Sequence, residues 1–150
     1  VPELEHKAGG PGSLSILRGS DYGLNTLGSG LFTADKTIAE KPDLVQLFVK
    51  AYTQAFQFVI ENPKEAVDIV VKANPEYKGK EAMLASQLQA DIDHTFFSAD
   101  TKAHGIGWIS PTQWEETART FQEQGALSKD ADPKVGFNNS FLEKAQPVKR

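Results

Sequence analysis

The sequence predicts an α/β protein that is rich in helix and has few short strands. Two observations lead to this prediction. Apolar residues recur at spacings of three and four over much of residues 42–124, which is the period of a helix with one buried face. Apolar and polar residues alternate only over residues 13–17, and a second short apolar stretch follows at 31–33. Strands should therefore be few and short.

Composition limits the kinds of protein this chain can be. Its 150 residues fit one ordinary domain. The net charge is -4 and the sixteen basic residues form no block, so we expect no nucleic-acid partner. The absence of cysteine excludes disulfides, thiolate metal sites and thiol nucleophiles. No apolar run reaches the roughly 18 residues that span a bilayer. No signal-peptide pattern opens the chain, so we expect a mature or truncated protein.

Residues 1–36 are interpreted as a glycine-rich strand and crossover segment. A glycine-proline loop at residues 9–12 precedes the alternating strand at 13–17. Three glycines and two Asx residues lie between residues 20 and 30, so this stretch should be irregular backbone that can approach a ligand or cross between lobes. Residues 31–33 are the second predicted strand.

Residues 37–127 are interpreted as the helical part of an α/β lobe. A stripe of apolar residues over 43–61 predicts a helix that faces the core. Asn62 is predicted to cap the next helix, with Pro63 at its first position and Glu65 completing a capping box. A third helix is predicted over residues 80–96, with apolar residues at every fourth position.

The clearest predicted helix start is at residue 110. Ser110 can cap, Pro111 takes the first helical position and Gln113 completes a capping box. Ile109 and Trp114 are then spaced as a hydrophobic staple, and Gly125 is the expected left-handed terminator. Residues 128–150 are predicted to be an extended C-terminal tail.

Two segments contain the predicted ligand-binding residues. Ser20, Asp21, Tyr22 and Asn25 offer hydroxyl, carboxylate, amide and aromatic groups for a polar heterocycle, although Asp, Asn and Gly also serve simple turns. Trp108 lies beside glycines that would leave its ring face uncovered, although a tryptophan is more often a core residue whose N–H finds a carbonyl.

No arrangement of residues supports catalysis, a metal site or a cofactor. The three histidines are not spaced as ligands of one metal ion, and no thiolate accompanies them. No nucleophile elbow and no phosphate-binding loop is present. We therefore expect a binding protein that is not an enzyme and has no cofactor.

The order of the motifs resembles a known family. A segment Asp-Tyr-Gly-Leu-Asn at 21–25 and a glycine-rich stretch at 28–33 lead into helices opened by Pro42 and by the pair Asn62-Pro63. Gly-Ile-Gly-Trp at 105–108, a helix that closes before Gly125, and Phe-Asn-Asn-Ser-Phe-Leu at 137–142 follow. This order is similar to the later part of THI5/NMT1-like solute-binding proteins, over roughly residues 13–142.

The resemblance implies a fold, partners and a location. It implies the helix-rich C-terminal part of a type II periplasmic-binding-protein fold. The protein would be the substrate-binding component of an ABC importer, working with a permease in the periplasm or cell envelope. It would capture a small solute by closure between two lobes, with a thiamine-pyrimidine-like heterocycle favoured and a sulfonate or related small molecule next. The other lobe would be a missing N-terminal lobe or a second copy of the chain.

Two alternatives stay open. One is a helical protein-interaction module without a small ligand, whose strand-like N-terminal piece adds to another chain's sheet. The other is a pyrimidine-precursor synthase of the THI5 type. In that branch, the resemblance implies a cysteine-rich motif and a pyridoxal cofactor, and this chain has no cysteine.

Overall fold

The computed structural model describes residues 2–10, 12–24 and 26–145. These residues form α-helices joined by loops and three short 3-10 turns. The α-helices are α1 (Pro2–Lys7), α2 (Asp35–Glu40), α3 (Pro42–Glu61), α4 (Pro63–Ala73), α5 (Glu81–His94), α6 (Ala99–His104), α7 (Pro111–Glu123) and α8 (Ser140–Lys144). The 3-10 turns are η1 (Gly19–Tyr22), η2 (Pro75–Tyr77) and η3 (Pro133–Val135). The predicted helix-rich character is confirmed.

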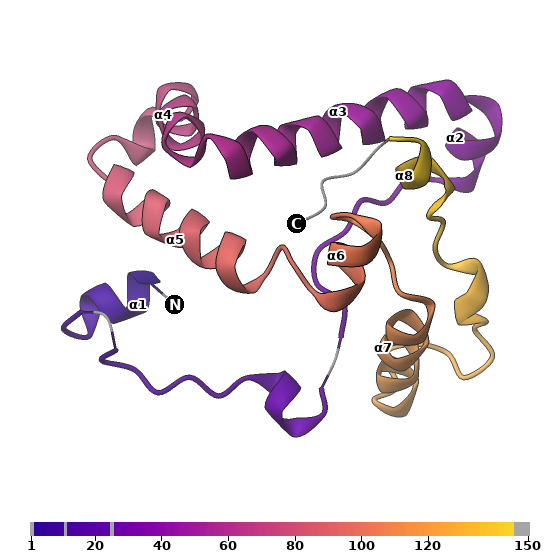
Figure 1. Ribbon diagram of the computed structural model, residues 1–150. Coiled ribbons are helices and arrows are strands. Elements are labelled where there is room, and N and C mark those ends of the chain that lie inside the picture. The colour runs from indigo at the N-terminus through magenta and orange to yellow at the C-terminus, as the bar shows by residue number, and fades with distance from the viewer. Residues whose placement is uncertain (1, 11, 25, 146–150) are drawn as a thin grey trace.

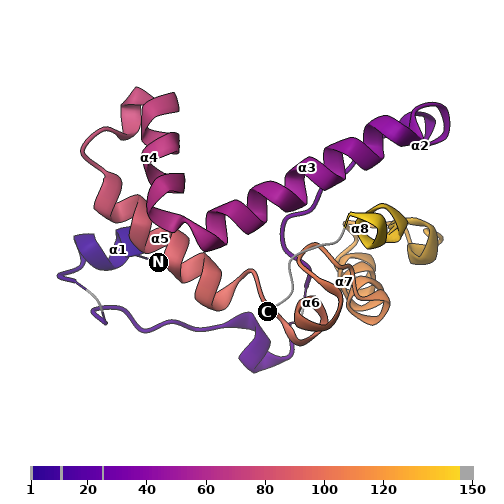
Figure 2. The ribbon, with the colours of Figure 1, turned by 45° about the horizontal axis from the view of Figure 1, so that its top comes forward.

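The helices form an open arrangement around the long helix α3 (Figure 1). Helix α4 folds back at one end of α3, and α5 packs on α4. Helix α1 contacts α5, while α2 and α8 pack against α3. Helices α6 and α7 lie beyond the C-terminal end of α5, and both views show this separation from α4 (Figures 1 and 2).

The molecule exposes much more surface than a closed fold of its size. Its accessible surface is 10,911 Å² for a mass of 16.4 kDa. A folded monomeric protein of that mass exposes about 7,500 Å². About 3,400 Å² of surface is therefore left open that a closed fold would cover.

The buried apolar residues are few, and most are small. One group lies where α4 meets α5, at Ala66, Val67 and Ile92. The other buried apolar residues belong to the C-terminal part of the chain: Ile106, Ala118, Leu142 and Ala145. Among the described residues, no helix is long and apolar enough to cross a membrane.

The predicted burial of the apolar stripe on α3 is wrong. Leu44, Phe48 and Tyr52 are 56%, 58% and 42% exposed, and Thr53 is the buried residue of this helix. The stripe has the right helical period. Its contacts are few: α2 and α8 pack near the start of α3, Phe56 meets Phe96, and α4 follows the end of the helix.

Proline places the helix starts as predicted, but the predicted caps do not form. Pro63 and Pro111 open α4 and α7. Neither Asn62 nor Ser110 accepts a side-chain capping hydrogen bond. Asn62 instead closes the preceding helix, because its side-chain amide donates to the Phe58 carbonyl at 3.2 Å. The left-handed terminator is confirmed, since Gly125 has φ +73°.

The prediction of strands at residues 13–17 and 31–33 is wrong for this structure. Segments 13–17 and 31–33 run as irregular backbone and pair with no strand among the described residues. The short helices α1, α2, α6 and α8 were not predicted from the sequence. Helix α8 and turn η3 lie within the segment interpreted as an extended tail.

The C-terminal part is tied to the rest by hydrogen bonds from side chains to backbone. The Asn139 amide pairs with both backbone groups of Ile109: it donates to the carbonyl at 2.9 Å and accepts from the N–H at 3.1 Å. Gln46 of α3 donates to the Phe141 carbonyl at 3.0 Å. These bonds hold the start of α8 between α3 and the segment that leads into α7.

Replacing Asn139 tests this tie. Asn139→Ala leaves the N–H and carbonyl of Ile109 without their partner, so we expect the free energy of unfolding to fall by about 1–3 kcal/mol. Asn138→Ala is the matched control, because the Asn138 side chain bonds only to the nearby Ser140 N–H. Urea denaturation measures the free energy of unfolding of both variants. Equal losses would show that the two hydrogen bonds between Asn139 and Ile109 add no specific stability.

Candidate ligand-binding site

The residues predicted at positions 20–22 lie in the 3-10 turn η1. Gly23 ends this turn with φ +81°, and its N–H donates to the Ser20 carbonyl at 3.2 Å. The Leu24 N–H closes back on the Gly19 carbonyl at 2.9 Å. Tyr22 is 75% exposed. The positive φ of this turn is therefore enough to explain a glycine at position 23. The turn also leaves the Tyr22 side chain in solvent.

Asn25, the fourth predicted residue of this segment, lies outside the described residues. Just after it, the chain is fastened to α7, because the Leu27 N–H donates to the Thr117 hydroxyl at 3.1 Å. Thr117 is buried and also donates to the Gln113 carbonyl at 2.8 Å. Figure 1 shows the chain after η1 rising past α6 and α7 toward α2.

Trp108 lies in the connection between α6 and α7. Gly105 and Gly107 have φ +106° and +94°, which favours glycine at both positions. The indole stacks on the His104 ring, with centroids 4.3 Å apart and planes within 20°. One face of Trp108 is therefore covered by an imidazole, and the ring is half-buried.

The hydrogen bond expected of a core tryptophan is found at Trp114. The Trp114 N–H donates to the Pro133 carbonyl at 2.6 Å, and its ring packs 5.8 Å from Phe137. The Trp108 indole N–H has no acceptor among the described residues. Trp108 and Tyr22 belong to separate turns, and their rings do not stack on each other.

A row of aromatic rings runs along α3 to the end of α5. Phe48 stacks on Tyr52 at 6.3 Å, and Tyr52 meets Phe56 edge to face at 5.0 Å. Phe56 then meets Phe96 edge to face at 5.1 Å. We call these four residues the aromatic row. Its α3 members are four residues apart and were predicted to face the core, because an apolar stripe on a helix is usually buried.

A separate groove of about 490 Å³ lies between α4 and α5. Lys64 and Asp68, one turn apart on α4, form an ion pair at 2.8 Å beside the groove, and this raises the pKa of Lys64. The backbone N–H groups of Glu81 itself and of Gly79 lower the pKa of the Glu81 carboxyl. The groove is lined by aliphatic and charged side chains and one amide, that of Gln89, and by no aromatic ring, so it does not suit stacking of a planar heterocycle.

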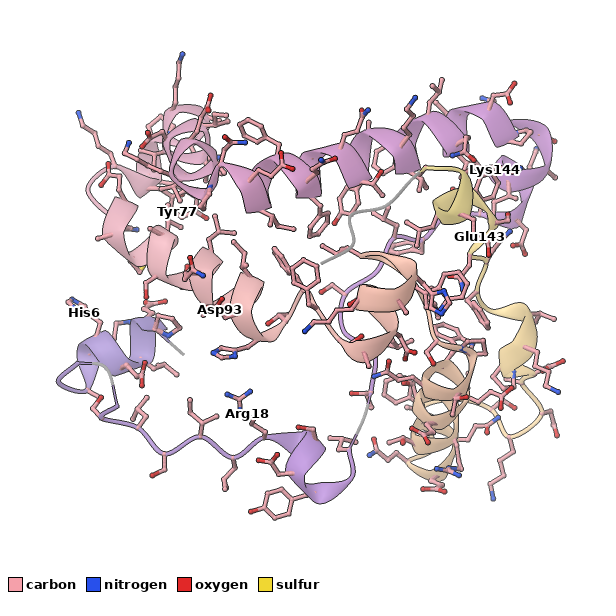
Figure 3. The ribbon with its side chains drawn as sticks, in the orientation of Figure 1. His6, Arg18, Tyr77, Asp93, Glu143 and Lys144 are labelled. Carbon is pink, nitrogen blue, oxygen red and sulfur yellow. The ribbon has the colours of Figure 1, made fainter. Side chains whose placement is uncertain are left out.

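The remaining ionisable groups form no metal centre in the described part of the chain, where no three His, Asp or Glu residues cluster. Figure 3 shows Arg18 directed from the N-terminal segment toward α5, and His6 on α1. The exposed aromatic surfaces are therefore the features of this structure best suited to a neutral, planar ligand.

Two matches to known proteins show what this chain is similar to. The helix-rich architecture is consistent with part of a solute-binding-protein fold. The family model described as NMT1/THI5 like matches residues 3–66. The chain is 26% identical over 129 residues to the riboflavin-binding protein RibY of Chloroflexus aurantiacus. These two matches bear out the resemblance to THI5/NMT1-like solute-binding proteins that the motifs indicate.

The match to RibY covers 86% of this chain and 36% of RibY. The chain thus spans about a third of the length of this relative. No solved structure matches.

The two tryptophans should differ in their contribution to stability. Trp114→Phe removes the donor to the Pro133 carbonyl, so we expect a loss of about 1–2 kcal/mol in the free energy of unfolding. Trp108→Phe is the control and should cost clearly less, because that indole N–H makes no hydrogen bond here. Urea denaturation followed by far-ultraviolet circular dichroism measures both. A larger loss for Trp108→Phe would contradict this assignment.

Proposed function

We propose that this chain belongs to the substrate-binding component of an ABC importer, and that it binds a planar nitrogen heterocycle rather than catalysing a reaction. The observation that supports this most directly is the similarity to a riboflavin-binding protein over 86% of the chain. The family match points to the same class of binding protein. A flavin and the thiamine-pyrimidine-like ligand expected from sequence are both flat, polar-edged heterocycles.

The ligand would be held by aromatic stacking together with a few polar contacts. Tyr22 and Trp108 are the predicted stacking residues, with Ser20, Asp21 and Asn25 as the polar rim. A neutral heterocycle needs no cluster of arginines, in contrast to a sulfonate. Arg18 and Arg119 are the arginines within the described residues, and they lie on the N-terminal segment and on α7.

The proposed mechanism is closure of a cleft. This chain would supply one wall, and a second lobe or a second copy of the chain would supply the other. The ligand would contact both walls only in the closed form, and this difference in affinity would shift the population toward closure. The closed receptor would then present the solute to a permease on the extracytoplasmic side of the membrane.

Riboflavin binding tests the proposal directly. Stacking on an aromatic side chain quenches flavin emission, so we expect saturable quenching when the chain is titrated into riboflavin. The thiamine pyrimidine is the second ligand to try, by competition, and taurine is the control sulfonate that should not compete. Ligand at a hundred times its Kd should also stabilise the fold by about 2.7 kcal/mol. The absence of quenching and of any thermal shift would reject a heterocycle receptor.

Tyr22→Ala tests the predicted rim. We expect ligand affinity to fall roughly two- to tenfold, which corresponds to one lost aromatic stack. The melting temperature should hardly change, because Tyr22 is 75% exposed. Tyr22→Phe is the control that keeps the ring. Isothermal titration calorimetry measures both variants, and an unchanged Kd for Tyr22→Ala would remove Tyr22 from the site.

A protein-interaction module without a small ligand is the second candidate function. The large exposed surface favours it, because open apolar surface of this extent marks a contact for another protein. The two functions differ in their expected behaviour: a receptor shows a thermal shift with a heterocycle, whereas an interaction module shows none and elutes as a complex.

A further inference from the structure

Helix α3 is covered on one side and open on the other. Gln46 marks the covered side, because its amide donates to the Phe141 carbonyl at 3.0 Å, and Thr53, two turns further along that side, is buried. With 3.6 residues per turn, the opposite side carries a separate row of apolar residues. We call this row the outer stripe. All of its members are exposed: Leu44, Leu47, Phe48, Ala51, Tyr52 and Ala55.

The first part of the outer stripe has the shape of a helix-packing surface. Leu44, Leu47 and Phe48 are 56%, 65% and 58% exposed. Together with Ala51 they lie at positions i, i+3, i+4 and i+7, and four residues at this spacing form the hole that receives one side chain of a facing helix. The small Ala51 side chain allows the facing helix to approach closely.

The charges beside the outer stripe are self-complementary. Asp43 and Lys50 lie on the same flank of α3, two turns apart, and both are exposed. Among the described residues, neither takes part in an ion pair. They are equally far from the peptide bond between residues 46 and 47. A second α3 that packs antiparallel about a two-fold axis at this point would therefore place Asp43 of each copy opposite Lys50 of the other.

The same two-fold axis also matches the apolar residues. It lies among the three most exposed members of the stripe, so Leu44 of each copy would enter the hole on the other. The surface available is sufficient, because the chain leaves roughly 3,400 Å² open and each partner of a standard interface buries about 800 Å². The outer stripe covers about 18 Å of helix, so the contact would be a small one.

We propose that the outer stripe of α3 binds a second copy of this chain, and that the two α3 helices pack antiparallel about a two-fold axis. Leu44, Leu47 and Phe48 form the apolar centre of the contact, and two ion pairs between Asp43 and Lys50 lie at its edge. The inference goes beyond ligand binding, because no residue of the predicted rim lies on α3. Its test needs no ligand, so it succeeds or fails separately from heterocycle binding.

Sedimentation equilibrium of the chain without ligand measures the dimer. We expect reversible dimerisation with a Kd of about 1–100 μM, which suits a small interface. Leu47→Glu places two like charges beside the two-fold axis, so it should weaken the dimer by about tenfold or more. Val135→Glu is the matched control and should leave the Kd unchanged, because Val135 lies in η3 and is 83% exposed.

Charge reversal tests the orientation of the two helices. Lys50→Glu alone sets carboxylates against each other at both edges, and Asp43→Lys alone sets ammonium groups there. Each variant should therefore dimerise about three- to tenfold more weakly than the parent chain at low salt. An equal mixture of the two variants should form a heterodimer whose Kd is within about twofold of the parent value, because every facing pair is again of opposite charge.

Lys72→Glu is the matched control for charge reversal. It makes the same change in net charge at an exposed position on α4, so mixing it with Asp43→Lys should restore nothing. Far-ultraviolet circular dichroism shows whether each variant keeps the helix content of the parent chain.

Three outcomes would overturn the inference. The first is a chain that stays monomeric up to the highest concentration at which it is soluble. The second is a dimer whose Kd responds neither to Leu47→Glu nor to the charge reversals. The third is a folded, monomeric chimera in which this chain replaces the matching region of RibY, since the outer stripe would then be covered within one polypeptide.

Discussion

Scarce apolar burial governs this structure, because the helices meet along short contacts and leave much of their apolar surface in water. Leu44, Leu47 and Phe48 show this on the longest helix, where each is more than half exposed. Burying a side chain of this size contributes about 1.5–3 kcal/mol. An amphipathic helix that keeps such a stripe exposed has therefore not used its main source of tertiary stability, and the stripe remains available to a partner.

Where apolar burial is small, specific side-chain hydrogen bonds fix the arrangement. The Gln122 amide reaches the carbonyls of Ser128, Lys129 and Ala131, which curls the chain after α7. The Trp114 N–H holds η3, and an added methyl group at Gly136 would lie 2.7 Å from the Trp114 ring. The C-terminal part is therefore closely packed around Trp114, although the arrangement of the helices as a whole is open.

The sequence predicted what local physics determines and failed where distant partners decide. Pro42, Pro63 and Pro111 marked three helix starts correctly, because the fixed φ of proline suits the first helical turn. The strands failed because a strand needs a partner, and the described chain contains none. In the site, Gly23 was visible as a turn residue. The glycines beside Trp108 were expected to leave its ring uncovered, but the His104 ring stacks on one face. The exposure of the aromatic row could not be predicted, because periodicity shows which face of a helix is apolar but not whether another element covers that face.

The aromatic row is partly open to solvent, because Phe48 and Tyr52 are 58% and 42% exposed. A planar ligand gains most from stacking when water is excluded from both of its faces, and a single open wall covers only one. In the proposed receptor, ligand affinity and fold stability would be coupled, because whatever closes the cleft also buries apolar surface that is exposed in this chain.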